Sequence, residues 1–168
     1  MLDPPRLGTT CIFVSNVLNG TVVRLDVSVS PAAVTVMNNT VIAKCYLHSP
    51  PPPTPVFALG PTGLAYDESA DALYVAAAQD NKIFAISNAE HRTAPPSNGT
   101  GAVIYQDNVH LCGPLGLALA PNGHLVTANG DAVNPPPASP PRLQQRLSEV
   151  EALATPALMV QGGADRCT

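Results

Sequence analysis

Residues 60–66 of the chain read Gly-Pro-Thr-Gly-Leu-Ala-Tyr, and the pattern returns at residues 113–119 as Gly-Pro-Leu-Gly-Leu-Ala-Leu. The match continues downstream, where Ala-Leu-Tyr-Val-Ala at residues 72–76 corresponds to His-Leu-Val-Thr-Ala at residues 124–128. Self-similarity at a fixed spacing is the signature of a repeat architecture. These stretches therefore predict a chain built from copies of one structural unit.

A third copy lies upstream, because residues 12–25 match residues 73–86 without a gap. Asn-Gly at 19–20 and Asp-Asn at 80–81 occupy the same position in these two copies. Asn, Asp and Gly tolerate the positive φ that a tight hairpin demands, so both places are predicted to be hairpin turns. Pro-Asn-Gly at 121–123 is a turn signal of the same kind in the third copy.

Each copy is predicted to form short antiparallel strands, because apolar and β-branched runs alternate with turn residues. The chain has 168 residues and nineteen prolines, well above the average usage of ~5%, which excludes long helices from most of it. The predicted strands are 63–66, 72–76, 82–86 and 102–105 in the central copy, 11–15, 21–27, 34–37 and 41–46 in the first, and 115–119 and 124–128 in the third.

Gly-Pro-x-Gly-Leu-Ala, then Leu-Tyr-Val-Ala, then Asp-Asn-Lys-Ile-Phe-Ala-Ile resembles an NHL repeat over about residues 9–134. The related six-bladed β-propellers include the gluconolactonase/strictosidine-synthase-like group. The resemblance implies an all-β partial β-propeller of two to three four-stranded antiparallel blades, with a binding face at one end of a central channel. The family includes lactonases, lyases, esterases and interaction scaffolds, so the resemblance implies an architecture and no particular activity.

The number of blades departs from this pattern, since closed propellers use about 4 to 8 blades. The first copy lacks its first strand, and the third stops after two strands. Such a chain leaves blade edges open, which favours self-association. We therefore expect a fragment of a longer propeller, with a ring completed by several chains as the alternative.

Residues 1–134 carry the blades, and the composition changes after them. Residues 135–141 form a proline-rich linker. In the tail, residues 142–168, an apolar stripe predicts a short amphipathic helix that ends before Pro156, and a helical or disordered tail follows from these patterns. The stripe consists of Leu143, Leu147, Val150 and Ala154.

Composition excludes several classes of partner. Eight Lys and Arg against twelve Asp and Glu give a net charge of −4, so we expect no nucleic-acid partner. No apolar run approaches the roughly 18 residues of a membrane-spanning helix. The first residues show no signal peptide, which leaves the localisation open, since a secreted or periplasmic protein truncated at its N-terminus would look the same.

Four cysteines have no spacing typical of a metal or redox site, and the sequence does not choose among their three pairings. The simplest interpretation is small buried side chains and one thiol in the tail. They are Cys11, Cys45, Cys112 and Cys167.

The best polar group of residues is His110, which precedes the Gly-Pro turn at 113–114, with Asn129 and Asp131 after the next strand. In propellers such positions lie at blade ends, where these side chains could bind a ligand, hold a divalent ion or orient water. The alternative is structural, because Asn-Gly-Asp is also a plain turn sequence and His110 could cap a loop. No nucleophile motif, P-loop or dinucleotide fingerprint is present, so no catalytic residue is predicted.

Two functions follow as hypotheses. The first is a non-enzymatic module that binds a protein or small-molecule ligand through blade-end loops and needs no cofactor. The alternative is a partial or degenerate metal-dependent lactonase or hydrolase of the gluconolactonase-like group, using a divalent metal such as Ca²⁺.

Overall fold

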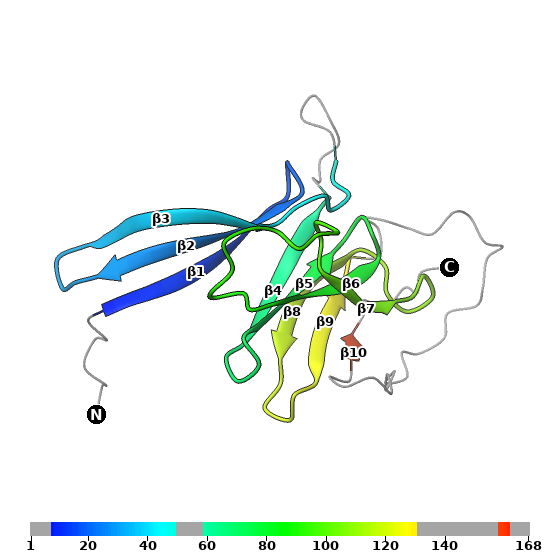
Figure 1. Ribbon diagram of the computed structural model, residues 1–168. Helices are drawn as coiled ribbons and strands as arrows, with labels where there is room; N and C mark the ends of the chain where they lie inside the picture. The colour runs from blue at the N-terminus through cyan, green and yellow to red at the C-terminus, as the bar shows by residue number, and fades with distance from the viewer. Residues whose placement is uncertain (1–7, 50–58, 131–157, 162–168) are drawn as a thin grey trace.

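The computed structural model describes residues 8–49, 59–130 and 158–161, and these residues form only strands, turns and loops (Figure 1). The all-β prediction is therefore confirmed for the described part of the chain. The predicted C-terminal helix and the proline-rich linker lie outside it, as does Asp131. Over the same described residues, no helix is long and apolar enough to cross a membrane.

Sheet 1 is formed by residues 8–43 and has the order β1-β2-β3, with antiparallel neighbours. Its strands are β1 (Gly8–Asn16), β2 (Thr21–Val29) and β3 (Val34–Ala43). The β1–β2 turn contains Gly20 at φ 63°, as the Asn-Gly signal predicted.

One detail of sheet 1 differs from the prediction, because residues 34–37 and 41–46 are not two strands. A single strand, β3, runs through Asn38 and Asn39 and ends at Ala43. Register shifts between Asp26 and Val27 and between Val22 and Val23 absorb two extra residues on β3 as bulges. The Asn38 amide donates to Asp26 at 3.3 Å and keeps this polar stretch paired within the sheet.

Sheet 2 is formed by residues 61–106, the segment predicted as the central copy, with four antiparallel strands in the order β4-β5-β6-β7. They are β4 (Pro61–Asp67), β5 (Ala72–Ala77), β6 (Lys82–Ser87) and β7 (Ala102–Gln106). All four predicted strands of this copy are confirmed. The β5–β6 turn places Asn81 at φ 50°, so its predicted hairpin is also confirmed.

Sheet 3 contains the antiparallel pair β8 (Pro114–Leu119) and β9 (Leu125–Asn129). Gly123, at φ 83°, lies in the turn between them. Four residues of the tail form β10 (Leu158–Gln161), which pairs in parallel with the free edge of β9. Sheet 3 therefore has the order β10-β9-β8.

Sheet 2 lies between the other two sheets and has an apolar core on each face. One core joins it to sheet 1, and the other joins it to sheet 3. The first core contains Val22, Ile42, Ala43, Tyr46, Leu73, Val75, Ala77, Phe84, Ile86 and Ala89. The second contains Ala65, Tyr74, Ala76, Ile83, Leu111 and Leu125, with Leu117 and Leu119 packed against it.

Strand β4 approaches β8 closely enough to require a glycine. A Cβ on Gly63 would lie 2.6 Å from the Leu117 backbone nitrogen and 2.7 Å from the Gly116 carbonyl carbon. A Cβ on Gly116, at the matching place in the repeat, would have nothing within 4 Å. The first glycine of this pair is therefore fixed by packing of sheet 2 on sheet 3, whereas the second faces open space.

The described cysteines do not include a reactive cluster. Cys11 is a half-buried free thiol and Cys45 an exposed one, so the expectation of small buried side chains is wrong at Cys45. Cys112 is buried and disulfide-bonded. Burial raises the pKa of the Cys11 thiol, with the neighbouring Glu90 carboxylate adding to the shift. A low-pKa thiolate nucleophile is therefore not built at Cys11.

Candidate functional site

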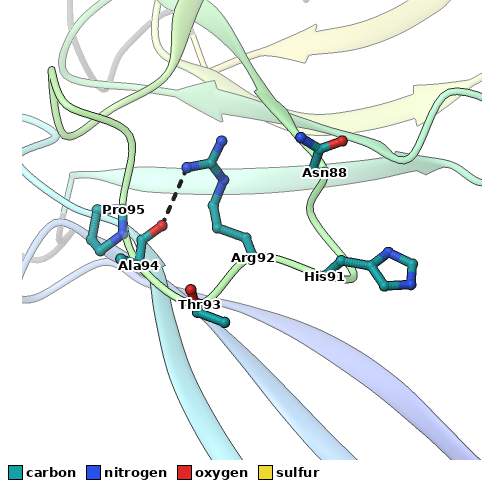
Figure 2. Close-up of a pocket in the computed structure, with 6 residues that line it drawn as sticks. All are labelled: Asn88, His91, Arg92, Thr93, Ala94 and Pro95. Atoms are coloured by element: carbon teal, nitrogen blue, oxygen red, sulfur yellow. Dashed lines mark hydrogen bonds between the residues drawn. The ribbon is translucent and has the colours of Figure 1, made fainter.

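The loop between β6 and β7, residues 88–101, carries two cavities that meet at Arg92. The first has a volume of about 290 Å³ (Figure 2), and the second has a volume of about 340 Å³. The first is lined by Asn88, His91, Arg92, Thr93, Ala94 and Pro95. The second is lined by Ala72, Ala85, Ser87, Arg92, Pro96, Ser97, Asn98, Gly101 and Ala102.

The loop is anchored to sheet 1 by Arg24, a buried residue in the middle of β2. The Arg24 guanidinium donates to the carbonyl oxygens of Glu90 and, at 3.0 Å, of Arg92. Its Nε lies 2.7 Å from the Asp26 carboxylate. This hydrogen bond lowers the pKa of Asp26, so the ion pair that orients Arg24 is held in its charged form.

A second anchor is Asp71, which stands at φ 44° in the turn between β4 and β5. Its Oδ1 accepts from the Glu90 backbone N–H at 2.8 Å and from the Tyr66 hydroxyl at 3.0 Å. Its Oδ2 accepts from His91 Nδ1 at 3.0 Å. Burial alone would raise the pKa of Asp71, but these hydrogen bonds outweigh it and the pKa is lowered.

The same carboxylate acts on the two side chains that it binds. The hydrogen bond to Asp71 raises the pKa of His91, so the imidazole is more readily protonated than usual. Burial, followed by the bond to Asp71, raises the pKa of Tyr66 and keeps its hydroxyl protonated. Potential ligand atoms of Asp71, Glu90 and His91 lie within 4.8 Å of one another, an arrangement that could hold a divalent cation.

Arg92 itself is held by the loop's own main chain. Its Nε donates to the Ser87 carbonyl at 3.1 Å and its Nη1 to the Ala94 carbonyl at 3.2 Å. Figure 2 shows the guanidinium between Ala94 and Asn88, while the His91 ring points away from it. Neither cavity lining contains Asp or Glu. A guanidinium so placed favours a carboxylate or phosphate group as its ligand, since its planar fork matches their oxygens.

The residues predicted from the sequence lie at the opposite end of β7 from this loop. Asn129 Nδ2 donates to the His110 carbonyl at 2.7 Å, and its Oδ1 accepts from the Cys112 N–H at 3.0 Å. The His110 ring pairs with Asp107 instead, with Nδ1 and Oδ2 2.6 Å apart. The structure thus brings His110 and Asn129 together through the main chain, with both side chains engaged in holding the loop that precedes β8. Asp131 lies outside the described residues.

Asp107 is the main hydrogen-bond acceptor in the loop between β7 and β8, residues 107–113. Besides the His110 ring, it accepts from the backbone N–H of Val109 and from the Tyr105 hydroxyl at 3.0 Å. Burial would raise the pKa of Asp107, but these bonds lower it overall. Burial and the nearby carboxylate raise the pKa of Tyr105 to about 12. These polar groups are therefore mutually satisfied and fasten the loop to sheet 2.

Sequence reasoning missed Arg24, Asp71 and Arg92. One signal was available, because the connection between the predicted strands 82–86 and 102–105 is the longest within the central copy, and long ordered loops are often functional. The contact of Arg24 with this loop spans more than sixty positions and could not be read from local patterns.

Comparison with known proteins finds no matching family model, no matching curated protein and no matching solved structure.

Proposed function

We propose that the chain is a non-enzymatic binding module, made of NHL-like propeller units, that recognises its ligand through the loop of residues 88–101. The observation that carries the proposal is that two cavities share Arg92 at the end of the central sheet. Their volumes lie near the lower end of the range for ligand pockets, which suits a small molecule or a few residues of a peptide.

The propeller part of the proposal is supported by the stacking of the sheets. Three copies matched in sequence form three sheets, and each face of the middle sheet is packed on a neighbour. Face-to-face packing of successive sheets is the arrangement that a propeller requires of its blades. In such an arrangement, residues 88–101 are a loop at a blade end.

The site is pre-organised, which favours binding. Arg24 and Asp71 hold the main chain of the loop at Glu90 from two different sheets. Because these contacts already hold the loop in the ligand-free protein, binding requires little further loop ordering and its entropy cost is low. Because Arg92 is charged and neither lining contains an acidic residue, the site favours an anionic group, for which a peptide carboxylate is the proposed ligand.

The test is isothermal titration calorimetry with short peptides that have a free C-terminal carboxylate, against the same peptides with an amidated C-terminus. We expect the free acids alone to bind, and Arg92→Gln to weaken their binding by about 10- to 100-fold, the value of a charge-assisted hydrogen bond. Lys82→Gln is the matched control, since Lys82 is a cation at the other end of β6. The proposed carboxylate ligand would be refuted if free-acid and amidated peptides bind equally well, or if Arg92→Gln and Lys82→Gln weaken binding equally.

The cluster of Asp71, Glu90 and His91 favours one other candidate, the metal-dependent hydrolase. In that case a divalent metal would sit on Asp71 rather than on His110 or Asp131. Saturating Ca²⁺ or Zn²⁺ should then raise the melting temperature by mass action, and Asp71→Asn should abolish the rise. An unmoved melting curve excludes this candidate.

A further inference from the structure

The first sheet has an apolar face that nothing in the described structure covers. Ile12, Val14 and Val41 are 46%, 39% and 40% exposed. Val14 pairs with Val23, which in turn pairs with Val41, so the three side chains form a row across β1, β2 and β3. Ile12 pairs with Leu25 beside this row. We call these five residues the sheet 1 outer face.

The matching positions in sheet 2 are buried. The gapless match of residues 12–25 with 73–86 aligns Ile12 with Leu73 and Val14 with Val75. Leu73 is 1% exposed and Val75 is 0% exposed, because sheet 1 packs against them. The same repeat position is therefore apolar in both sheets, and it is buried wherever a preceding sheet is present.

The third sheet has an exposed face of the complementary kind within the described part of the chain. Gly116 pairs with Ala128, and Ala118 pairs with Val126, so these four small side chains share one face of β8 and β9. Gly116, Ala118 and Ala128 are exposed and Val126 is half-buried. Strand β10 pairs with the edge of β9. We call these four residues the sheet 3 outer face.

The matching face of sheet 2 shows what such a surface packs against. Gly63 and Ala65 align with Gly116 and Ala118, and both lie against sheet 3. Gly63 meets the Leu117 backbone so closely that no Cβ fits between them. Within the chain, the small residues of β4 thus lie where sheet 3 packs on sheet 2, and Leu117 and Leu119 of sheet 3 join a core that also contains Tyr74 and Ile83.

We infer that a second copy of this chain docks head to tail, with the sheet 1 outer face of one copy packed on the sheet 3 outer face of the other. The valine, leucine and isoleucine side chains of one copy then pack on the glycine, alanine and valine residues of the other, as the leucines of sheet 3 pack on the side of sheet 2 that carries Gly63 and Ala65. The contact joins two different surfaces, so it closes only as a ring. Two copies supply six sheets, within the roughly 4 to 8 of closed propellers, whereas three copies supply nine. The assembly is therefore a closed dimer with two identical interfaces.

This inference rests on the proposed repeat architecture and is independent of the ligand site. Its test is light scattering behind a sizing column, on the whole chain and on two variants, Val14→Asp and Ala118→Asp. Each variant places a carboxylate in both interfaces of the ring. We expect the parent chain to have the mass of a dimer, and each variant to dissociate with a Kd raised at least ~30-fold, the effect of losing an interface hot spot.

Val103→Asp is the matched control, because Val103 is 49% exposed on β7 and belongs to neither outer face. It should leave the dimer intact, and melting curves of all variants should confirm that each chain folds. A monomeric or polydisperse parent chain would overturn the inference. So would a dimer that only one of the two variants disrupts, since a head-to-tail contact needs both faces. If the parent chain forms the dimer but binds no peptide in the calorimetric test, that result counts against the ligand site and leaves the dimer inference standing.

Discussion

Replacing Gly63 with alanine tests the packing of sheet 2 on sheet 3 at its tightest point. The added methyl group would lie 2.6 Å from the Leu117 nitrogen and 2.9 Å from the Leu115 carbonyl oxygen. These are backbone atoms, so no side-chain rotamer change can relieve the contact, and β4 and β8 must move apart. Separation exposes part of the second core, which contains Ala65, Leu125 and their neighbours.

The expected cost can be worked out from two opposing effects. Overpacking of a well-packed core costs about 1–3 kcal/mol. Replacing glycine also lowers the conformational entropy of the unfolded chain, which stabilises the folded state by about 0.4–1 kcal/mol. The free energy of unfolding of Gly63→Ala should therefore fall by about 1–2 kcal/mol. For a chain of this length this corresponds to a melting temperature lower by about 2–8 °C, measurable by circular dichroism.

Gly116→Ala is the control, because a Cβ at Gly116 meets nothing within 4 Å in the protomer. At protein concentrations low enough to give monomers, it should be neutral or slightly stabilising. Where the chain dimerises, it should weaken the dimer, since the partner's sheet would meet the new methyl group as β8 meets Gly63. Equal melting temperatures for Gly63→Ala and the parent chain would refute the close approach of β4 to β8.

Three other outcomes are expected. Arg24→Met removes the buried guanidinium that holds the loop, so the free energy of unfolding should fall by about 2–3 kcal/mol and amide hydrogen exchange in residues 88–101 should accelerate. Unchanged exchange in these residues would show that the loop does not depend on β2. A proton NMR titration should give His91 a pKa above the ordinary 6.5, and Asp71→Asn should return it toward that value. The stability contributed by the His91–Asp71 pair is present below pH 6.5 and is lost as the pH rises through the folded-state pKa of His91. If Asp71→Asn leaves the pKa of His91 unchanged, the pairing is contradicted. Tyr46→Phe removes a buried hydroxyl that donates to a loop carbonyl at 2.7 Å, so urea unfolding should show a loss of about 1–2 kcal/mol, and a loss below 0.3 kcal/mol would argue against a bond in solution.

Local patterns were sufficient for the strands of the central sheet and for the hairpin turns. The alternation of apolar residues with Asn, Asp and Gly located every strand of the central sheet, because period-2 burial and positive φ leave a mark on each short segment. They failed at Asn38 and Asn39, where two polar residues resembled a break. Bulges and a side-chain bond to Asp26 keep that stretch in β3, and both depend on the partner strand.

The candidate site was less accessible to sequence reasoning. The Asn129 side chain donates to the His110 carbonyl and the His110 ring pairs with Asp107, so both side chains hold the loop that precedes β8. The cavities around Arg92 depend on Arg24, which reaches the loop from another sheet. Contacts between segments that are distant in the sequence produce no local pattern of residues, so they could not be predicted from one sequence alone.

The most direct measurement of the proposed function is a titration of the isotopically labelled chain with carboxylate-bearing peptides, followed by amide NMR shifts. We expect shifts confined to residues 88–101 and the neighbouring turn at Asp71, and we expect no shifts with amidated peptides. Shifts centred instead on residues 107–112 around His110, or no shifts with any peptide, would contradict the proposed function.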